Sequence, residues 1–278
     1  MTVHHVNAGT MCPLGAKYFT GDPGLGRGLV TCHCLVVETS DSLLIVDTGM
    51  GTDDMRHPYR RLGVPFTAGF AVKPDVEDTA FARVKGLGFD PDDVRHIVAT
   101  HLDLDHAGGL PDFPGARVHV TADEHAAAVS PSLRDRARYR HKFHFAHGPD
   151  WAIHNTAGGG DEWFGFKSVR ILPGVDPEVL LIPLPGHSIG HTAVAVRDGD
   201  GWLLHCGDAY FNRSEMATPP SAPKGIAGFE RVMAADNKAR VANQERLREL
   251  AASHSDEVRI FCAHDHVELE RLQAQASN

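Results

Sequence analysis

The stretch His101-Leu102-Asp103-Leu104-Asp105-His106-Ala107-Gly108-Gly109 decides how this chain of 278 residues is interpreted. It contains four possible metal ligands within six residues and directly follows the apolar run 96–100. A run rich in β-branched residues is typical of a buried strand, so the ligands lie where that strand ends. Imidazoles and carboxylates packed this closely repel one another or stay unsatisfied unless a cation holds them together. The stretch therefore predicts a metal site, with a solvated loop of Asp and His as the alternative.

Composition is that of a globular protein with a core, because 42% of the residues are hydrophobic and 23% are charged. The formal net charge of -9 argues against nucleic-acid binding as the main activity. Residues 1–19 show no secretory signal, and no run is long enough to cross a membrane. We expect a cytoplasmic protein that acts on a small molecule, without a nucleic-acid or membrane partner, and homodimerisation is possible.

The five cysteines are odd in number and scattered. Cys32 and Cys34, one residue apart in a strand-like run, are a weak candidate for a zinc site. Reduced, buried thiols are the default expectation for the cysteines of a cytosolic protein.

Hydrophobic patterning predicts strands separated by helices, and hence an α/β fold with two sheets and helices outside them. Expected strands are 29–38, 42–47, 94–99, 118–120, 168–172, 179–183, 193–197, 202–206 and 258–262. Expected helices are 76–87, 123–129 and 234–252, while 51–75 is expected to be a long irregular connection. Residues 1–278 are expected to form a single domain.

Residues 134–165 break the pattern and are predicted to be an insertion or lid. The segment holds four Arg at alternate positions, four His, two Trp and three consecutive Gly (158–160). The four Arg cannot share one helix face, so some are expected to point elsewhere, toward an acidic substrate for example. A specificity element and a plain surface helix with a loop are both open interpretations.

Three further apolar strands each lead into a metal-capable residue: His187, Asp208 and His264. Each is weak evidence by itself, because a His after a strand is more often structural. Together with the cluster at 101–106 they supply seven ligands, enough for two metals that share a bridge. The seven are His101, Asp103, Asp105, His106, His187, Asp208 and His264.

At this point the chain resembles the metallo-β-lactamase fold superfamily, whose signature is His-x-His-x-Asp-His followed by a distant His, Asp and His. The resemblance covers about residues 25–266 and implies an αβ/βα four-layer sandwich of two mixed sheets. The Asp47-Thr48-Gly49-Met50 segment and the Pro185–His191 loop are similar to those of lactonases and glyoxalase II-like thioesterases.

The resemblance also implies roles for individual residues. His101, Asp103 and His187 would hold a first metal; Asp105, His106 and His264 would hold a second. Asp208 would bridge the two metals together with a water or hydroxide, and Asp208 or Asp105 would accept or relay a proton. Tyr210 is a candidate catalytic residue, although the related lactonases place their Tyr three residues after the bridging Asp and here Phe211 takes that place.

Asp103 stands where the family pattern has His. Two divalent cations, three carboxylates and one bridging hydroxide have formal charges that sum to zero, so we expect a more neutral centre and a weaker electrophile. Oxygen ligands also favour manganese or iron over zinc, although zinc remains the expected metal.

The expected function is therefore hydrolysis of a small ester, with a lactone as the leading candidate, by a metal-bridging hydroxide. A di-iron oxidase or oxygenase on the same fold is the alternative that Asp103 suggests, and a thioesterase is a second. A non-catalytic binding protein is disfavoured because all seven ligand positions are filled.

Overall fold

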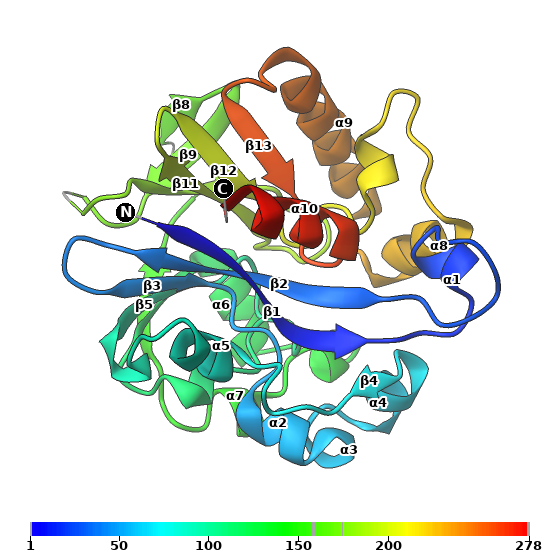
Figure 1. Cartoon of the computed structure of the whole chain (residues 1–278), viewed down its shortest axis with the longest axis horizontal. Coiled ribbons are helices and arrows are strands. Elements are labelled where there is room, and N and C mark those ends of the chain that lie inside the picture. Colours follow the sequence, from blue (N-terminus) through cyan, green and yellow to red (C-terminus); the bar gives the residue numbers. More distant parts are fainter. Residues whose placement is uncertain (1, 157–159, 174, 277–278) are drawn as a thin grey trace.

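The computed structural model describes residues 2–156, 160–173 and 175–276. Two mixed β-sheets pack face to face, and helices lie on the outer surface of each sheet (Figure 1). The predicted four-layer α/β sandwich is confirmed. None of the helices in the described ranges is both long and apolar enough to cross a membrane.

The first sheet has seven strands. β1, β2 and β3 are antiparallel neighbours, whereas β3, β5, β6 and β7 run parallel. The order across the sheet is β4 (Val72–Lys73), β1 (Val3–Met11), β2 (Val30–Glu38), β3 (Leu43–Val46), β5 (Val94–Val98), β6 (Arg117–Thr121) and β7 (Asp150–His154).

The second sheet has six strands and is antiparallel except for the pair β12 and β13. Its order is β13 (Val258–Phe261), β12 (Gly201–His205), β11 (Thr192–Asp198), β10 (Val179–Pro183), β9 (Phe166–Arg170) and β8 (Asp161–Trp163).

Alternating side chains of the central strands bury both faces of each sheet. On β2, Leu35 packs between the two sheets, while Val36 packs on the outer face of its own sheet. That outer face is covered by α5 (Ala80–Gly86) and α6 (Ala122–Val129), and the second sheet is covered by α9 (Asn237–Ser253). Full burial of one such aliphatic side chain contributes about 1.5–3 kcal/mol, which fixes strand register and therefore which residues end each strand.

Several helices and one strand were not predicted from the sequence. The irregular connection expected at 51–75 is wrong, because it contains the short helices α2 (Thr52–Arg56), α3 (Pro58–Arg61) and α4 (Val64–Gly69). Each is too short for a hydrophobic period to show, and α3 and α4 carry Pro in their first turn, which suits a helix start. β1, α1 (Ala16–Phe19), α8 (Lys224–Met233) and α10 (His266–Ala276) were also not predicted.

Residues 134–165 contain α7 (His141–His144), β7 and β8, and the two strands add an edge to the first and second sheet, respectively. Of the three consecutive glycines at 158–160, the first two lie outside the described residues. Four short 3-10 helices complete the described elements, at Pro91–Asp93, Leu110–Asp112, Asp135–Ala137 and Arg213–Met216.

Candidate metal centre

The ends of four strands bring the predicted ligands to one edge of the sandwich. The cluster 101–106 follows β5, and His187 follows β10. Asp208 and His264 follow β12 and β13, which are parallel neighbours. Parallel strands end at the same edge of a sheet, so ligands far apart in the sequence meet where the two sheets face each other.

One group of donors consists of His101, Asp103 and His187, whose ligand atoms all lie within 4.8 Å of one another. The Oδ2 atom of Asp103 lies 3.0 Å from His187 Nε2 and 3.5 Å from His101 Nε2. Burial lowers the pKa of His187 to about 4, so its imidazole is neutral and has a lone pair for a cation.

We call Asp105, His106 and His264 the second group, because His106 and His264 both approach Oδ1 of Asp208 and Asp105 lies beside His264. His264 Nε2 lies 3.8 Å from Asp105 Oδ2. Asp208 joins both groups: its Oδ1 atom is 3.1 Å from the Nε2 atoms of His106 and His264. Its Oδ2 atom is 3.3 Å from His187 Nε2 and 3.7 Å from His101 Nε2.

Several buried atoms here have no hydrogen-bond partner. Within the described residues, His101 Nε2, His106 Nε2 and Asp208 Oδ1 are buried without one. Three of the rings are anchored through Nδ1: His101 to the Thr100 hydroxyl at 3.0 Å, His106 to Asp47 Oδ2 at 2.8 Å and His264 to the Thr31 carbonyl at 2.7 Å, whereas Nδ1 of His187 is buried without a partner in the described part of the chain. A ring held on one nitrogen with the other aimed inward is the usual arrangement of a metal-binding His. The donor set therefore fits a divalent cation.

Asp47 lies behind the cluster and holds it in place. Its carboxylate accepts from the Thr100 backbone N–H and hydroxyl, at 2.7 Å each, as well as from His106. Burial raises the pKa of Asp47, but the neighbouring His106, His205 and His101 together more than offset this, and the net pKa lies below the usual value. The carboxylate therefore stays ionised.

His191 supports the centre without joining its donors. Its Nδ1–H donates to the Leu184 carbonyl, and its Nε2 accepts from the backbone N–H of Asp208 at 3.0 Å. Gly207 must be glycine here: its φ is +52°, and a Cβ atom would lie 2.7 Å from His191 Nε2.

Two residues that the sequence interpretation missed complete the surroundings. Arg138 is buried and its guanidinium grips Asp103: Nε lies 2.8 Å from Oδ1, and Nη2 lies 2.7 Å from Oδ2. Burial raises the pKa of the Asp103 carboxyl, but Arg138, His101 and His187 together outweigh burial and hold that pKa well below its usual range. The four Arg at 134–140 were the only sign in the sequence of a cation near the site, and they did not indicate which Arg would contact Asp103.

Glu124 is the other missed residue and is fully buried on α6. Its Oε1 accepts from the backbone N–H of Leu102 at 3.0 Å and from the Tyr139 hydroxyl at 3.2 Å. Its Oε2 accepts from the Ser188 hydroxyl at 2.5 Å and from the Gly190 N–H at 3.3 Å. One carboxylate thus ties the cluster loop to the His187 loop.

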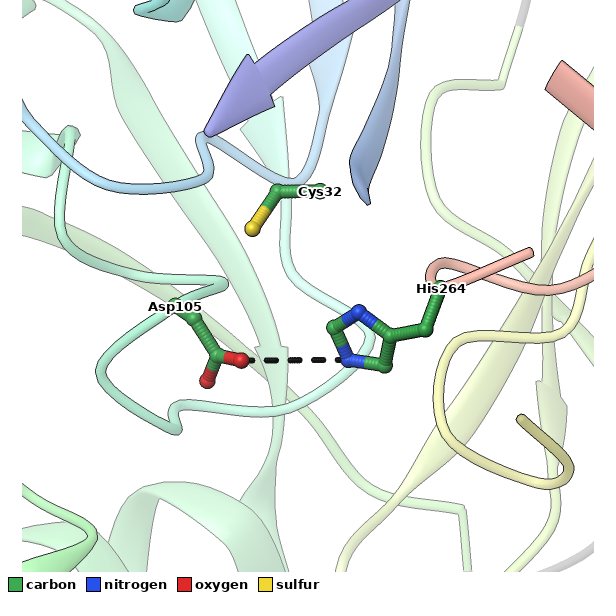
Figure 2. A group of neighbouring side chains, drawn as sticks. All are labelled: Cys32, Asp105 and His264. Atoms are coloured by element: carbon green, nitrogen blue, oxygen red, sulfur yellow. Dashed lines mark ion pairs between the residues drawn. The ribbon is translucent and has the colours of Figure 1, made fainter. Parts of the chain in front are cut away.

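Figure 2 shows Cys32 beside Asp105 and His264. The sulfur and one ligand atom of each neighbour all lie within 4.8 Å of one another. Sulfur and nitrogen bound to one tetrahedral zinc ion would lie about 3.6 Å apart. The limit of 4.8 Å is wider than that, so it places the thiol next to the donor set without assigning it to that set.

Thiol reactivity should separate Cys12 from the other cysteines. Burial raises the pKa of Cys32, Cys34, Cys206 and Cys262, and all four are buried, whereas Cys12 is half-buried. Since the thiolate is the reactive form, we expect one fast-reacting thiol in the folded protein and all five after unfolding. A timed titration with a disulfide reagent measures this; more than one fast thiol would contradict it.

A cavity of about 400 Å³ opens onto the donors. Asp103, Asp105, His187, Asp208 and His264 lie at its floor. Its walls are mostly apolar and come from the end of β1, the start of β2, from α1, α4 and α8, and from the loops after β5 and β12. The wall residues are Met11, Pro13, Phe19, Val30, Pro65, Phe66, Phe70, Leu104, Phe211, Ile226, Phe229, Val232 and Met233. Of the described residues in the segment 134–165, Arg134, Asp135, Ala137 and Arg138 reach the cavity.

The structure does not bring Tyr210 into this cavity. Its side chain is fully buried in the core between the second sheet and α9, and its hydroxyl donates to Glu268 on α10 at 3.1 Å. Phe211 lines the cavity instead and stacks on His264. The reason is the turn after Asp208, which directs successive side chains to opposite sides.

Comparisons with known proteins agree with this geometry. The family model of the metallo-beta-lactamase superfamily matches residues 27–264. A probable metallo-hydrolase of Mycobacterium tuberculosis is 40% identical over 266 residues, which cover 95% of this chain and 80% of that protein. The N-acyl homoserine lactonase AiiA of Bacillus thuringiensis subsp. kurstaki is 26% identical over 233 residues, 84% of this chain and 80% of AiiA.

A solved structure of an AiiA mutant from B. thuringiensis, with N-decanoyl-L-homoserine bound at its active site, is similar with a TM-score of 0.70 and 25% sequence identity. The similarity covers 98% of this chain and 97% of that chain. Fold and site thus define a metal-dependent hydrolase. The chain belongs to the metallo-beta-lactamase superfamily.

Proposed function

We propose that the seven converging side chains hold two divalent cations, zinc foremost. His101, Asp103 and His187 hold the first, Asp105, His106 and His264 hold the second, and Asp208 is shared. The observation that carries this assignment is the position of Asp208, whose two oxygens face different groups of donors. Asp103 adds an oxygen donor to the first group and keeps manganese and iron among the metals to be tested.

We further propose that the protein hydrolyses a small ester with an apolar tail, a lactone being the leading candidate. Two cations in these positions would supply a hydroxide at neutral pH and polarise the ester carbonyl. The cavity walls would hold the tail: Phe66 of α4 packs against Phe70, which directly follows α4, and Phe229 of α8 packs against Phe70. N-acyl homoserine lactones, on which AiiA acts by its name, have this form.

The chain's own carboxylates would handle the proton of the reaction. Asp105 lies on the cavity floor, and its side chain is 13% exposed, compared with 4% for Asp208. Asp105 can therefore pass a proton toward the leaving group, whereas Asp208 is enclosed by histidines and keeps the two donor groups at a fixed spacing. Tyr210, held by Glu268, has no part in this scheme.

A substrate panel combined with metal analysis tests this function. We expect about two metal ions per chain, and hydrolysis of acyl lactones that a chelator abolishes and added zinc restores. Because each buried methylene contributes about 0.8 kcal/mol, kcat/KM should rise about fourfold per methylene until the cavity is filled. Thioesters, phosphoesters and β-lactams belong on the same panel.

Two outcomes would contradict the proposal. Lactone turnover that survives complete removal of metal would exclude the hydroxide mechanism. Bound iron with oxygen consumption and no ester hydrolysis would favour the di-iron oxidase instead.

A further inference from the structure

Arg138 forms a close ion pair with Asp103, one of the proposed metal ligands. Its Nε atom lies 2.8 Å and 3.1 Å from the two oxygens of Asp103, and Nη2 lies 2.7 Å from Oδ2. Both side chains are buried, with 5% of Arg138 and 9% of Asp103 exposed. This is a charge-assisted, two-pronged contact between two buried side chains, and such contacts are stronger than hydrogen bonds between neutral groups.

The same guanidinium is fixed on its far side. Nη1 donates to the carbonyl of His187 at 3.0 Å and to that of Met233, the last residue of α8, at 2.9 Å. A cation at the C-terminal end of a helix is also favoured by the helix dipole. With four of its five N–H groups engaged, Arg138 is a rigid part of the floor and has little left to offer a substrate.

The contact changes the charge of the centre. Asp103 adds one negative charge relative to the His of the family pattern, and Arg138 adds one positive charge beside it. The pair is therefore neutral, as an imidazole ligand is, and the centre recovers the single positive charge that it would have with His. The formal charge of zero expected from the sequence included Asp103 but not Arg138.

The contact also directs the carboxylate. Arg138 binds both carboxylate oxygens, Oδ1 through Nε and Oδ2 through Nη2, and Oδ2 also lies 3.0 Å from His187 Nε2 and 3.5 Å from His101 Nε2. Oδ2 is therefore the oxygen that lies beside the two histidines of the first group, where a cation would meet one carboxylate oxygen as it would meet the single nitrogen of a His ligand. Arg134 makes the contrast clear, because it binds carbonyls of α8 and its end from an exposed position and does not touch Asp103.

We propose that Asp103 and Arg138 act as one unit that takes the place of a neutral His ligand on the first metal, with Arg138 as the positioning residue. This inference rests on the proposed two-metal function. It predicts that the two positions are interdependent: His at 103 suits the centre only when the cation at 138 has been removed.

The test compares the wild type with Arg138→Gln, Asp103→His and the double variant, with the exposed Arg136→Gln as the matched control. Zinc affinity is measured by competition with a chromophoric chelator, and the fold of each metal-free protein is checked by circular dichroism. Each single variant should lose about 10- to 100-fold in affinity at one zinc site. Asp103→His fails because it leaves a buried Arg without its counter-ion next to a dication.

The double variant should recover most of that affinity, which a purely structural role of Arg138 would not allow. Losses that simply add in the double variant, or an Arg138→Gln variant with wild-type affinity, would overturn the inference. If Arg138→Gln does not fold, the double variant decides: a folded, zinc-binding protein supports the unit and an unfolded one overturns it.

Failure of the proposed function is a different result. In that case the wild-type protein itself would bind no stoichiometric metal. Two tightly bound metals in the wild type together with additive losses would leave the hydrolase intact and remove only the paired unit.

Discussion

Replacing Asp208 with Ala is expected to reduce kcat/KM by about 10³-fold or more and to remove at least one metal ion per chain. Its two oxygens face both donor groups, so no other residue can replace the link. Each cation contributes several kcal/mol to the stabilisation of transition-state charge, and each 1.36 kcal/mol is a factor of ten in rate. Steady-state kinetics and metal analysis of the same preparation measure both effects.

The matched control is Asp200→Ala, in the exposed turn between β11 and β12, which should leave both readouts unchanged. The fold should also survive in Asp208→Ala, because the backbone N–H of residue 208 still donates to His191. Retention of two metals with full activity would refute the shared role of Asp208.

Replacing Glu124 with Ala is expected to give the largest loss of stability, about 3–5 kcal/mol. The carboxylate accepts from Leu102, Ser188, Gly190 and Tyr139, and its removal would leave these buried donors without their partner. Each buried donor left without a partner costs about 1–3 kcal/mol, although local relaxation recovers part of the total. Urea unfolding of the metal-free protein measures the change.

Asp123→Ala is the matched control, since it lies in the same first turn of α6 with an exposed side chain. It should change stability by no more than about 0.5 kcal/mol. Glu124→Gln should fall between the two, because its amide oxygen still accepts while its nitrogen faces donors. A Glu124→Ala variant as stable as the control would show that the two loops do not depend on this carboxylate.

The fold and the donor positions were predictable because both follow from short-range patterns. Apolar runs that end in His101, His187, Asp208 or His264 mark strands whose ends carry polar side chains, and a strand that is buried on both faces has no freedom of register. The sandwich is confirmed by the two sheets and by the family match. The assignment of the seven ligands remains a prediction.

The partners of these residues could not be predicted, since they depend on distant contacts. Glu124 looked like an ordinary residue in the first turn of a helix, yet its side chain turns inward to two loops. Arg138 was one of four alternating Arg, and only the tertiary structure singles it out as the partner of Asp103. Sequence spacing carries no information on such pairings.

The cavity walls were missed for a different reason. α4 has six residues and Pro in its first turn, so no helical period can emerge. α8 follows a Pro-rich segment that hid its start. Tyr210 was considered for catalysis from its neighbourhood in sequence, but neighbours along a turn point in opposite directions.

The donors come from strand ends of both sheets, four from the first and three from the second. Metal binding at the centre is therefore coupled to the packing of the two sheets against each other. Metal present at a hundred times its dissociation constant would add about 2.7 kcal/mol to the free energy of unfolding. Metal supply would then set how long the protein persists as well as how fast it works, and a cell that runs short of metal would lose the molecule together with its activity.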